Sequence, residues 1–434
     1  MRTILSVIIT LFITQLVYAQ DIDFELKKRI DMLGFKKLNI TKDKDLNLYN
    51  LGKELFFSNE VSGNRNINCS TCHHPDAFSA DLLPLPIGVG ANGIATKRIQ
   101  NSKNQIVPRN SPALYNLGHG VNKMFWDARV SYDIFDEVYT TPEPSLNGYN
   151  PSSNHITKHL TGALSAQALF PPLSHLEMRG KKGSNEIADA KTNIEAWSLI
   201  MKRLLGISKI KEGFLKAFNG QKDFNIGHFG AAVAEFEKHR FVADDTNWDR
   251  YLEGDLKALN AQEKRGAKVF MGHGRCFVCH SGSHLSSFKL ENIAAPQLGP
   301  GKDIHQNDEG RFLITKRARD LYKFRVPPLR NVALTSPYFH SGAYLTLEEV
   351  VNHYEGGVNS IDKYDSTEID ITFRKNYSKD LFVETNPYRI FRKKENAHPM
   401  LRARSIRLSE QEKKDLIYFL KYSLTQNKLK KYLK

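Results

Sequence analysis

The chain contains few cysteines: only four among its 434 residues, and all four lie in two close pairs. After the first 20 residues it has no apolar run long enough to cross a bilayer, few strand patterns and no nucleic-acid-binding motif. These absences exclude a nucleic-acid-binding module and a membrane span beyond the start of the chain, and they favour a mainly helical fold. The length predicts two or three domains, and the hydrophobic content of 41% is sufficient for a buried core.

The one long apolar run lies at the start of the chain. Arg2 is followed by apolar residues from Ile4 to Val17, and small residues precede a cleavage point after Ala19. This pattern is typical of a secretory signal peptide, and the run is short for a membrane span. Residues 1–19 are therefore predicted to be removed on export to the periplasm, with an uncleaved anchor as the alternative. No cysteine lies near the cleavage point, which argues against lipid attachment.

The chain carries a formal net charge of +15. A basic surface of this kind can attract an acidic protein partner or anionic lipid. However, Lys and Arg are spread along the whole sequence, with only a short basic run at the end, KLKKYLK. We therefore favour a lysine-rich solvated surface over a dedicated binding patch.

The four cysteines form two copies of Cys-x-x-Cys-His, in NCSTCHHPD and in GRCFVCHSG. Such pairs occur in redox dithiols, in four-sulfur zinc sites and in c-type haem attachment sites. A histidine directly after the second cysteine is required only for haem. Two thiols can add to the two vinyl groups of one porphyrin edge, and the next residue then lies beneath the iron. The sequence therefore predicts two covalent c-type haems, held by Cys69, Cys72, Cys276 and Cys279, with His73 and His280 as iron ligands.

The residues before each motif are also repeated. Gly52 and Phe56 precede the first motif, and Gly266 and Phe270 precede the second, each pair one helical turn apart. In small cytochromes c a glycine in this helix allows close approach to a partner helix near the haem. The weak repeat predicts two cytochrome c-like units.

We place the boundary between these units near residue 255. Residues 20–255 would form an N-terminal domain enlarged by insertions, after a short polar lead-in, and residues 256–434 a C-terminal domain with a closing helix. Loops are expected at LLPLPIGVGANG and TTPEPSLNGYNPSSN, and a helix at GHFGAAVAEFEKHRF. Helix starts are expected at Asn260, Thr346 and Ser409, because each fits an N-cap position.

Longer stretches of the chain resemble the bacterial di-haem cytochrome c peroxidases and their MauG-type relatives. The likeness spans about residues 50–425 and rests on LGKELFFSNEVSGNRNINCSTCH, RNSPALYN, MFWDAR, CFVCHSG and FRVPPLRNVALTSPYFHSGAYLTLEEVVNHY. It implies an N-terminal peroxidatic haem, a C-terminal electron-transfer haem, hydrogen peroxide as substrate and a small electron donor such as cytochrome c. Dimers are common in the family, so a homodimer is also compatible with the resemblance.

The resemblance also assigns roles to individual residues. Trp126 takes the place of the tryptophan that lies between the two haems. Asn110, together with the backbone oxygens of Thr335 and Pro337, matches a calcium site, and oxygen ligands from loops suit calcium.

Two departures from the family concern the first haem. Many family peroxidases supply a distal histidine from a loop, and the matching PIGVG places Val89 there, which cannot bind iron. The nearby alternatives are His74 and His119. An iron with an open position needs a carboxyl group to move a proton during peroxide cleavage. In the family this group follows the tryptophan closely, in a Gln-Ala…Pro…Glu-Met pattern. Here the pattern appears later, in AQALFPPLSHLEMRG, and SYDIFDEVYTTPEPSLNGYNPSSN is expected to be part of an insertion. The pattern identifies Glu177 as the carboxyl group, with Gln167 and Pro171 beside it. The rival is Glu143.

The third departure concerns the second haem. Family peroxidases use a methionine in the helix after TLEE, and the matching residue here is Tyr354, as in MauG-type relatives. Tyrosinate favours ferric and higher-valent iron, whereas methionine raises the potential. His353 and Met400 are the alternative ligands.

Three functions follow from these observations. The leading hypothesis is a periplasmic di-haem peroxidase that reduces hydrogen peroxide to water. The second is a MauG-type oxidase that uses peroxide to oxidise a partner protein or another substrate. The third is a di-haem electron carrier without enzymatic activity.

Overall fold

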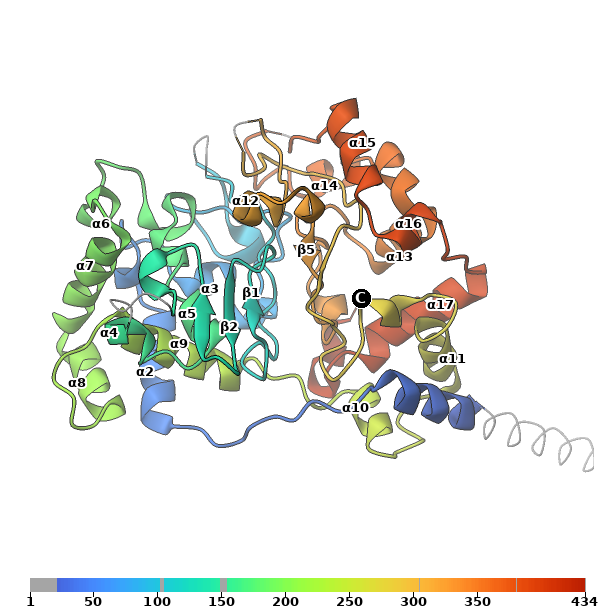
Figure 1. The fold of residues 1–434 in the computed structure, drawn as a ribbon, viewed down its shortest axis with the longest axis horizontal. Coiled ribbons are helices and arrows are strands. Elements are labelled where there is room, and N and C mark those ends of the chain that lie inside the picture. The colour runs from blue at the N-terminus through green and yellow to red at the C-terminus, as the bar shows by residue number, and fades with distance from the viewer. Residues whose placement is uncertain (1–21, 102–104, 149–153, 304, 380, 434) are drawn as a thin grey trace, which may run out of the picture.

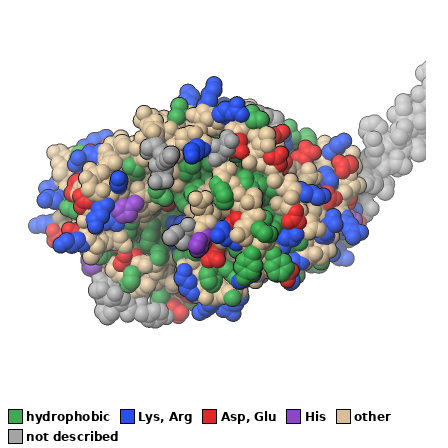
Figure 2. Space-filling view, turned by 90° about the horizontal axis from the view of Figure 1, so that it is seen from above, with side chains coloured by type: hydrophobic (Ala, Val, Ile, Leu, Met, Phe, Trp, Pro, Cys, Tyr) green, Lys and Arg blue, Asp and Glu red, His purple; other side chains and the backbone are tan. Residues whose placement is uncertain are grey.

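The computed structural model describes residues 22–101, 105–148, 154–303, 305–379 and 381–433. The expected signal peptide, residues 1–19, lies outside these ranges. The architecture is mainly helical, as predicted, with long irregular connections (Figure 1). Within the described ranges, no helix combines the length and the apolar character that a bilayer crossing requires. Figure 2 shows Lys and Arg scattered among Asp and Glu on the face that it presents, without a single basic patch.

Helices α2 to α9 and a small sheet lie at one end of the molecule (Figure 1). The bounds of these helices are α2 Leu46–Phe56, α3 Cys69–Cys72, α4 Asn154–Thr157, α5 Ala163–Gln167, α6 Glu186–Asp189, α7 Asn193–Leu205, α8 Ser208–Ala217 and α9 Ile226–Arg240. The helix expected at GHFGAAVAEFEKHRF is confirmed as α9, and α2 packs across it. A Cβ on Gly52 would lie only 1.8 Å from the carbonyl oxygen of Ala232, so the two helices approach too closely for any other residue there.

The sheet consists of three short antiparallel strands, β1 Lys123–Met124, β2 Val130–Asp133 and β3 Val138–Thr140. Tyr132 and Tyr139 face each other across β2 and β3, with ring centroids 4.6 Å apart. This hairpin falls in SYDIFDEVYTTPEPSLNGYNPSSN, the segment that the sequence predicts to be part of an insertion. The sequence signal is weak because the strands are only two to four residues long, too short to show a repeated alternation.

The other end of the molecule contains α10, α11 and α13 to α17, whereas α12 lies nearer the middle (Figure 1). Their bounds are α10 Asn247–Leu252, α11 Ala261–Phe270, α12 Phe312–Thr315, α13 Leu347–Gly356, α14 Thr367–Thr372, α15 Pro387–Glu395, α16 Pro399–Arg402 and α17 Glu410–Tyr418, and the strands β4 Leu290–Glu291 and β5 Phe324–Arg325 form a pair. The N-caps predicted at Asn260, Thr346 and Ser409 are all confirmed, each within a capping box.

The close helix crossing of the first end is repeated here. Helix α11, which leads into the second Cys-x-x-Cys-His motif, packs against α17. A Cβ on Gly266 would lie 2.1 Å from the carbonyl oxygen of Asp415 and 2.6 Å from the Cβ of Phe419. The glycine repeat in the sequence therefore corresponds to two similar helix contacts.

The segment expected as a polar lead-in is partly helical, at residues 22–33. Leu26 and Phe35 belong to the same buried cluster as Trp248 and Phe270, so this segment packs with the second end of the molecule. Asp23 fixes it there, because its carboxylate lies 2.8 Å from the ammonium group of Lys264. The boundary near residue 255 stays a prediction.

Candidate functional site

Two cavities of similar size are each lined by one Cys-x-x-Cys-His motif. The larger cavity is lined by Cys276, Cys279 and His280, and we call it the C-terminal cavity. The smaller cavity is lined by Cys69, Cys72 and His73, and we call it the N-terminal cavity. None of the four cysteines forms a disulfide. Each cavity is largely apolar, so its residues fit a haem held by two thioethers and one imidazole.

The two motif histidines are oriented in the same way. Nδ1 of His73 donates to the carbonyl oxygen of Ser79 at 3.0 Å, and Nδ1 of His280 donates to that of Leu285 at 3.1 Å. This arrangement leaves Nε2 of each ring as the lone-pair nitrogen, which is the atom a metal binds. Burial lowers the pKa of both imidazoles, to about 4 for His280, so both rings are neutral at physiological pH.

Two residues line both cavities: Trp126 and Arg325. The indole Nε1 of Trp126 donates to the carbonyl oxygen of Asn110 at 2.8 Å, which fixes the ring between the cavities. Arg325 lies beside it on β5, because its backbone N–H donates to the carbonyl oxygen of Trp126 at 2.6 Å. The sequence resemblance assigned a bridging position to Trp126, but no sequence pattern singled out Arg325.

The expected proton-transfer group lies in the N-terminal cavity. Glu177, Gln167 and Pro171 all line it together with His73. Glu177 belongs to a π-helical turn, His175–Arg179, and its backbone N–H donates to the hydroxyl of Ser174 at 3.3 Å. Burial raises the pKa of the Glu177 carboxyl, while the nearby charges of Arg129, Lys302 and Arg109 oppose that rise.

The rival carboxyl, Glu143, lies elsewhere. Its side chain accepts hydrogen bonds from Ser145 and from the amide group of Asn193, at 2.8 and 2.6 Å. It lines a separate polar hollow and is not part of the N-terminal cavity. The structure therefore brings Glu177, and not Glu143, together with the first motif.

The structure also shows where Val89, expected in place of a distal histidine, and the alternatives His74 and His119 lie. Among the described residues that line the N-terminal cavity, His73 is the one histidine. Val89 does not line the cavity; its backbone N–H instead donates to the carbonyl oxygen of Leu176 at 3.0 Å, beside the turn that carries Glu177. His74 caps a short turn on the surface, and His119 binds the carbonyl oxygen of Lys238.

In the C-terminal cavity, Tyr354 and Met400 both line the wall, together with His398, which no sequence pattern singled out. The hydroxyl of Tyr354 makes no hydrogen bond within the described part of the chain, and burial raises its pKa. His353 points elsewhere. Its ring nitrogens bind the hydroxyl of Tyr344 at 3.0 Å and the carbonyl oxygen of Ile293 at 2.8 Å, so neither is available to a metal.

Of the expected calcium ligands, Asn110 lies in the N-terminal cavity, where its carbonyl oxygen accepts from Trp126. Asn110 is buried, its backbone N–H donates to the carbonyl oxygen of His340, and its side-chain amide donates to that of Leu83. The hydroxyl of Thr335 donates to a neighbouring carbonyl. Within the described residues, no group of three or more His, Cys, Asp or Glu side chains could hold a metal ion. The calcium site, with Asn110, Thr335 and Pro337, stays a prediction.

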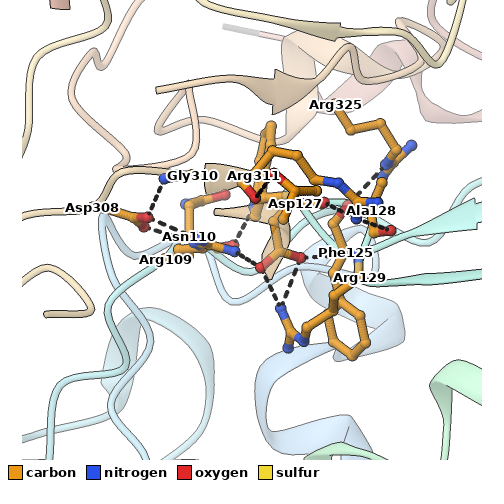
Figure 3. Close-up of polar contacts among 12 residues, drawn as sticks. Arg109, Asn110, Phe125, Asp127, Ala128, Arg129, Asp308, Gly310, Arg311 and Arg325 are labelled. Carbon is orange, nitrogen blue, oxygen red and sulfur yellow. Dashed lines mark hydrogen bonds and ion pairs between the residues drawn. The ribbon is translucent and has the colours of Figure 1, made fainter. Parts of the chain in front are cut away.

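A buried charge cluster beside the N-terminal cavity was not expected from the sequence (Figure 3). The guanidinium of Arg109 binds Asp308 through two N–H groups at 2.6 and 2.8 Å, and Asp127 through a third at 2.6 Å. Arg129 adds a second contact to Asp127 at 3.2 Å. Arg109 lowers the pKa of both carboxyls against the effect of burial, to about 2 for Asp308. Asp127 and Arg129 lie in MFWDAR, close to Arg109 in the chain, but Asp308 lies 199 positions from Arg109, so their pairing could not be predicted from the sequence.

Glu237 of α9, which the sequence did not indicate, also lines the N-terminal cavity. Glu237 is buried, one of its oxygens has no hydrogen-bond partner among the described residues, and burial raises its pKa to about 8. The carboxyl is therefore largely neutral at pH 7.

Comparison with known proteins places these features in a family. The family model described as di-haem cytochrome c peroxidase matches residues 47–257. The cytochrome c551 peroxidase of Pseudomonas aeruginosa is 31% identical over 302 residues, which cover 69% of this chain and 69% of that protein. The methylamine utilization protein MauG of Methylorubrum extorquens is 26% identical over 307 residues, which cover 71% of this chain and 68% of that protein.

Solved structures show the same fold. A MauG-like protein associated with microbial copper homeostasis superposes with a TM-score of 0.60 at 22% identity, over 91% of this chain and 94% of that one. The diheme peroxidase BthA from Burkholderia thailandensis gives 0.58 at 17% identity, over 92% and 91% of the two chains. Trp126 lines both cavities, each of which is also lined by one Cys-x-x-Cys-His motif. Together with the 31% identity to a cytochrome c551 peroxidase, this shows that the chain belongs to the di-haem cytochrome c peroxidase family of oxidoreductases.

Proposed function

We propose that the chain is a periplasmic peroxidase that reduces hydrogen peroxide to two waters. The reaction takes up two protons from solvent and two electrons from a small redox protein such as cytochrome c. The observation that carries this proposal is the pair of motif-bearing cavities joined by Trp126. Cys69, Cys72 and His73 would hold one haem and Cys276, Cys279 and His280 the other. When bound, the haems would supply the redox chemistry: peroxide reduction in the N-terminal cavity and electron entry in the C-terminal one.

The chain itself supplies proton transfer and the electron route. Glu177 would take a proton from one peroxide oxygen and return it to the other, which leaves as water. Gln167 and Pro171 shape the same cavity, and Trp126 provides an aromatic ring between the two sites. A calcium ion at Asn110, Thr335 and Pro337 would brace the boundary at which Trp126 is held.

The decisive experiment is peroxide turnover by the purified holoprotein with a reduced small cytochrome c. We expect peroxide-dependent oxidation of the cytochrome, and a high-spin ferric signal beside a low-spin one in the EPR spectrum of the resting protein. Two low-spin haems that do not react with peroxide would contradict the proposal and support a di-haem electron carrier.

The second candidate function is a MauG-type oxidase of a partner protein or another substrate. One observation favours it: Tyr354 lines the C-terminal cavity, and its hydroxyl makes no hydrogen bond to another described residue. A tyrosinate ligand would lower the potential of that haem and make it a poorer acceptor from cytochrome c. We expect Tyr354→Phe to change the low-spin absorption and EPR signals of the C-terminal haem. Met400→Leu is the matched control and should leave them unchanged. The reverse result would assign the ligand to Met400 and favour the peroxidase.

A further inference from the structure

Arg325 occupies a position that the proposed function does not explain. Besides Trp126, it is the one described residue that lines both cavities. Its side chain is 3% exposed, and its Nε–H donates to the carbonyl oxygen of Phe125 at 3.1 Å (Figure 3). Together with the backbone bond to Trp126, this contact fixes the guanidinium at the boundary between the two sites.

The guanidinium of Arg325 has no anionic partner among the described residues. Arg109 and Arg129, by contrast, are paired with Asp127 and Asp308. The Nη1 group of Arg325 is buried without any hydrogen-bond partner in the described chain. Burial lowers its pKa to about 10, so the side chain stays charged at neutral pH. A buried, unpaired charge with an unused donor is costly, which indicates that an anion completes this site.

The acidic side chains that line the N-terminal cavity are Glu177 and Glu237, and burial raises the pKa of both carboxyls, which favours their neutral form. Four cations line the N-terminal cavity, namely Arg109, Arg129, Lys302 and Arg325. The carboxylates of Asp127 and Asp308 are already bound by the first two. Every haem carries two propionate carboxylates, and a guanidinium binds a carboxylate through paired N–H groups. Arg325 is therefore a cation of this cavity without a carboxylate partner among the described residues, and a haem propionate would supply one.

We propose that Arg325 is a positioning residue that binds a haem propionate at the boundary of the two cavities, so that one positive charge acts on both haems. This inference rests on the two haems proposed above and is independent of whether the enzyme is a peroxidase or an oxidase. A fixed positive charge favours the reduced form of each iron. Arg325 therefore raises both reduction potentials together and holds the propionate edge of the haem beside Trp126.

The test is a spectroelectrochemical titration of the holoprotein with Arg325→Gln. We expect the equilibrium constant for one-electron reduction to fall at least tenfold for each of the two haems, which corresponds to 59 mV. Arg325→Lys keeps the charge and should retain both potentials. The matched control is Arg311→Gln, because Arg311 donates to the carbonyl oxygens of Asp127 and Ala128 at the same boundary but lines neither cavity. It should leave both potentials unchanged.

Haem content, measured by absorbance of the denatured protein and by mass spectrometry, separates the possible failures. Two attached haems with a shift in only one potential, or in neither, would overturn the shared role of Arg325 and leave the proposed function intact. A wild-type protein with fewer than two haems would overturn the proposed function as well. If Arg325→Gln fails to attach haem, the Arg325→Lys variant provides the test. Wild-type potentials in that variant support the inference, and a tenfold or greater fall in the equilibrium constants for reduction contradicts it.

Discussion

Replacing Glu177 with glutamine should lower peroxide turnover by roughly 10²- to 10⁴-fold, the usual contribution of a positioned acid–base group. Glutamine keeps the shape of the side chain but cannot take up and return a proton. Both haems should stay attached, because Glu177 lines the cavity without contributing to either motif. The measurement is the steady-state rate with reduced cytochrome c, together with the haem content of the variant.

Glu143→Gln is the matched control and should retain full activity, since Glu143 lies outside the cavity. The pH profile gives a second readout. Proton uptake needs the ionised carboxylate, and burial raises the pKa of Glu177. Turnover should therefore rise with pH through a value above the ordinary 4.5 of a glutamate, and this limb should be missing in the variant. Equal losses in both variants, or an unchanged acid limb, would assign the proton transfer to another group.

Asp308→Asn should destabilise the folded protein by about 3–5 kcal/mol, the usual cost of removing one partner from a buried ion pair. The change leaves the guanidinium of Arg109 buried with Asp127 as its one remaining carboxylate. Urea unfolding of the holoprotein would measure the loss. Asp245→Asn removes a carboxylate from an exposed pair with Arg250 and should cost at most about 1 kcal/mol. Similar losses in the two variants would show that the buried cluster adds no stability.

The same carboxylate makes stability depend on pH at the acid end. The folded-state pKa of Asp308 is lowered from 3.8 to about 2 by Arg109. Its stabilising contribution is therefore complete above pH 3.8 and is lost as the pH falls through about 2. In Asp308→Asn this part of the acid dependence should disappear.

The haem sites could be predicted from sequence because their evidence is local. The thiols, the following histidine and the preceding Gly-x-x-x-Phe all lie within one short stretch, and the N-caps at Asn260, Thr346 and Ser409 depend on residues three apart. A family pattern selected Glu177, and the structure places it in the N-terminal cavity, although the chain between Trp126 and Glu177 includes a hairpin that the sequence did not indicate.

The charge cluster and Arg325 could not be predicted in this way. Arg109 meets Asp308, and Trp126 meets Arg325, across about 200 residues, and nothing in either stretch indicates the other. For the same reason, the sequence did not indicate that residues 22–33 pack against the second end of the molecule. The sequence also could not exclude His353 as a haem-iron ligand, because its ring nitrogens form hydrogen bonds with Tyr344 and Ile293 only in the folded chain.

The two glycine crossings have a consequence for the order in which the protein matures. In each case the helix that leads into the motif rests on a helix that comes much later in the chain: α2 on α9, and α11 on α17. During synthesis, each pair of thiols therefore emerges before the helix that completes its surroundings. The first pair of thiols is therefore accessible for haem attachment before α9 packs on α2, and the second pair before α17 packs on α11.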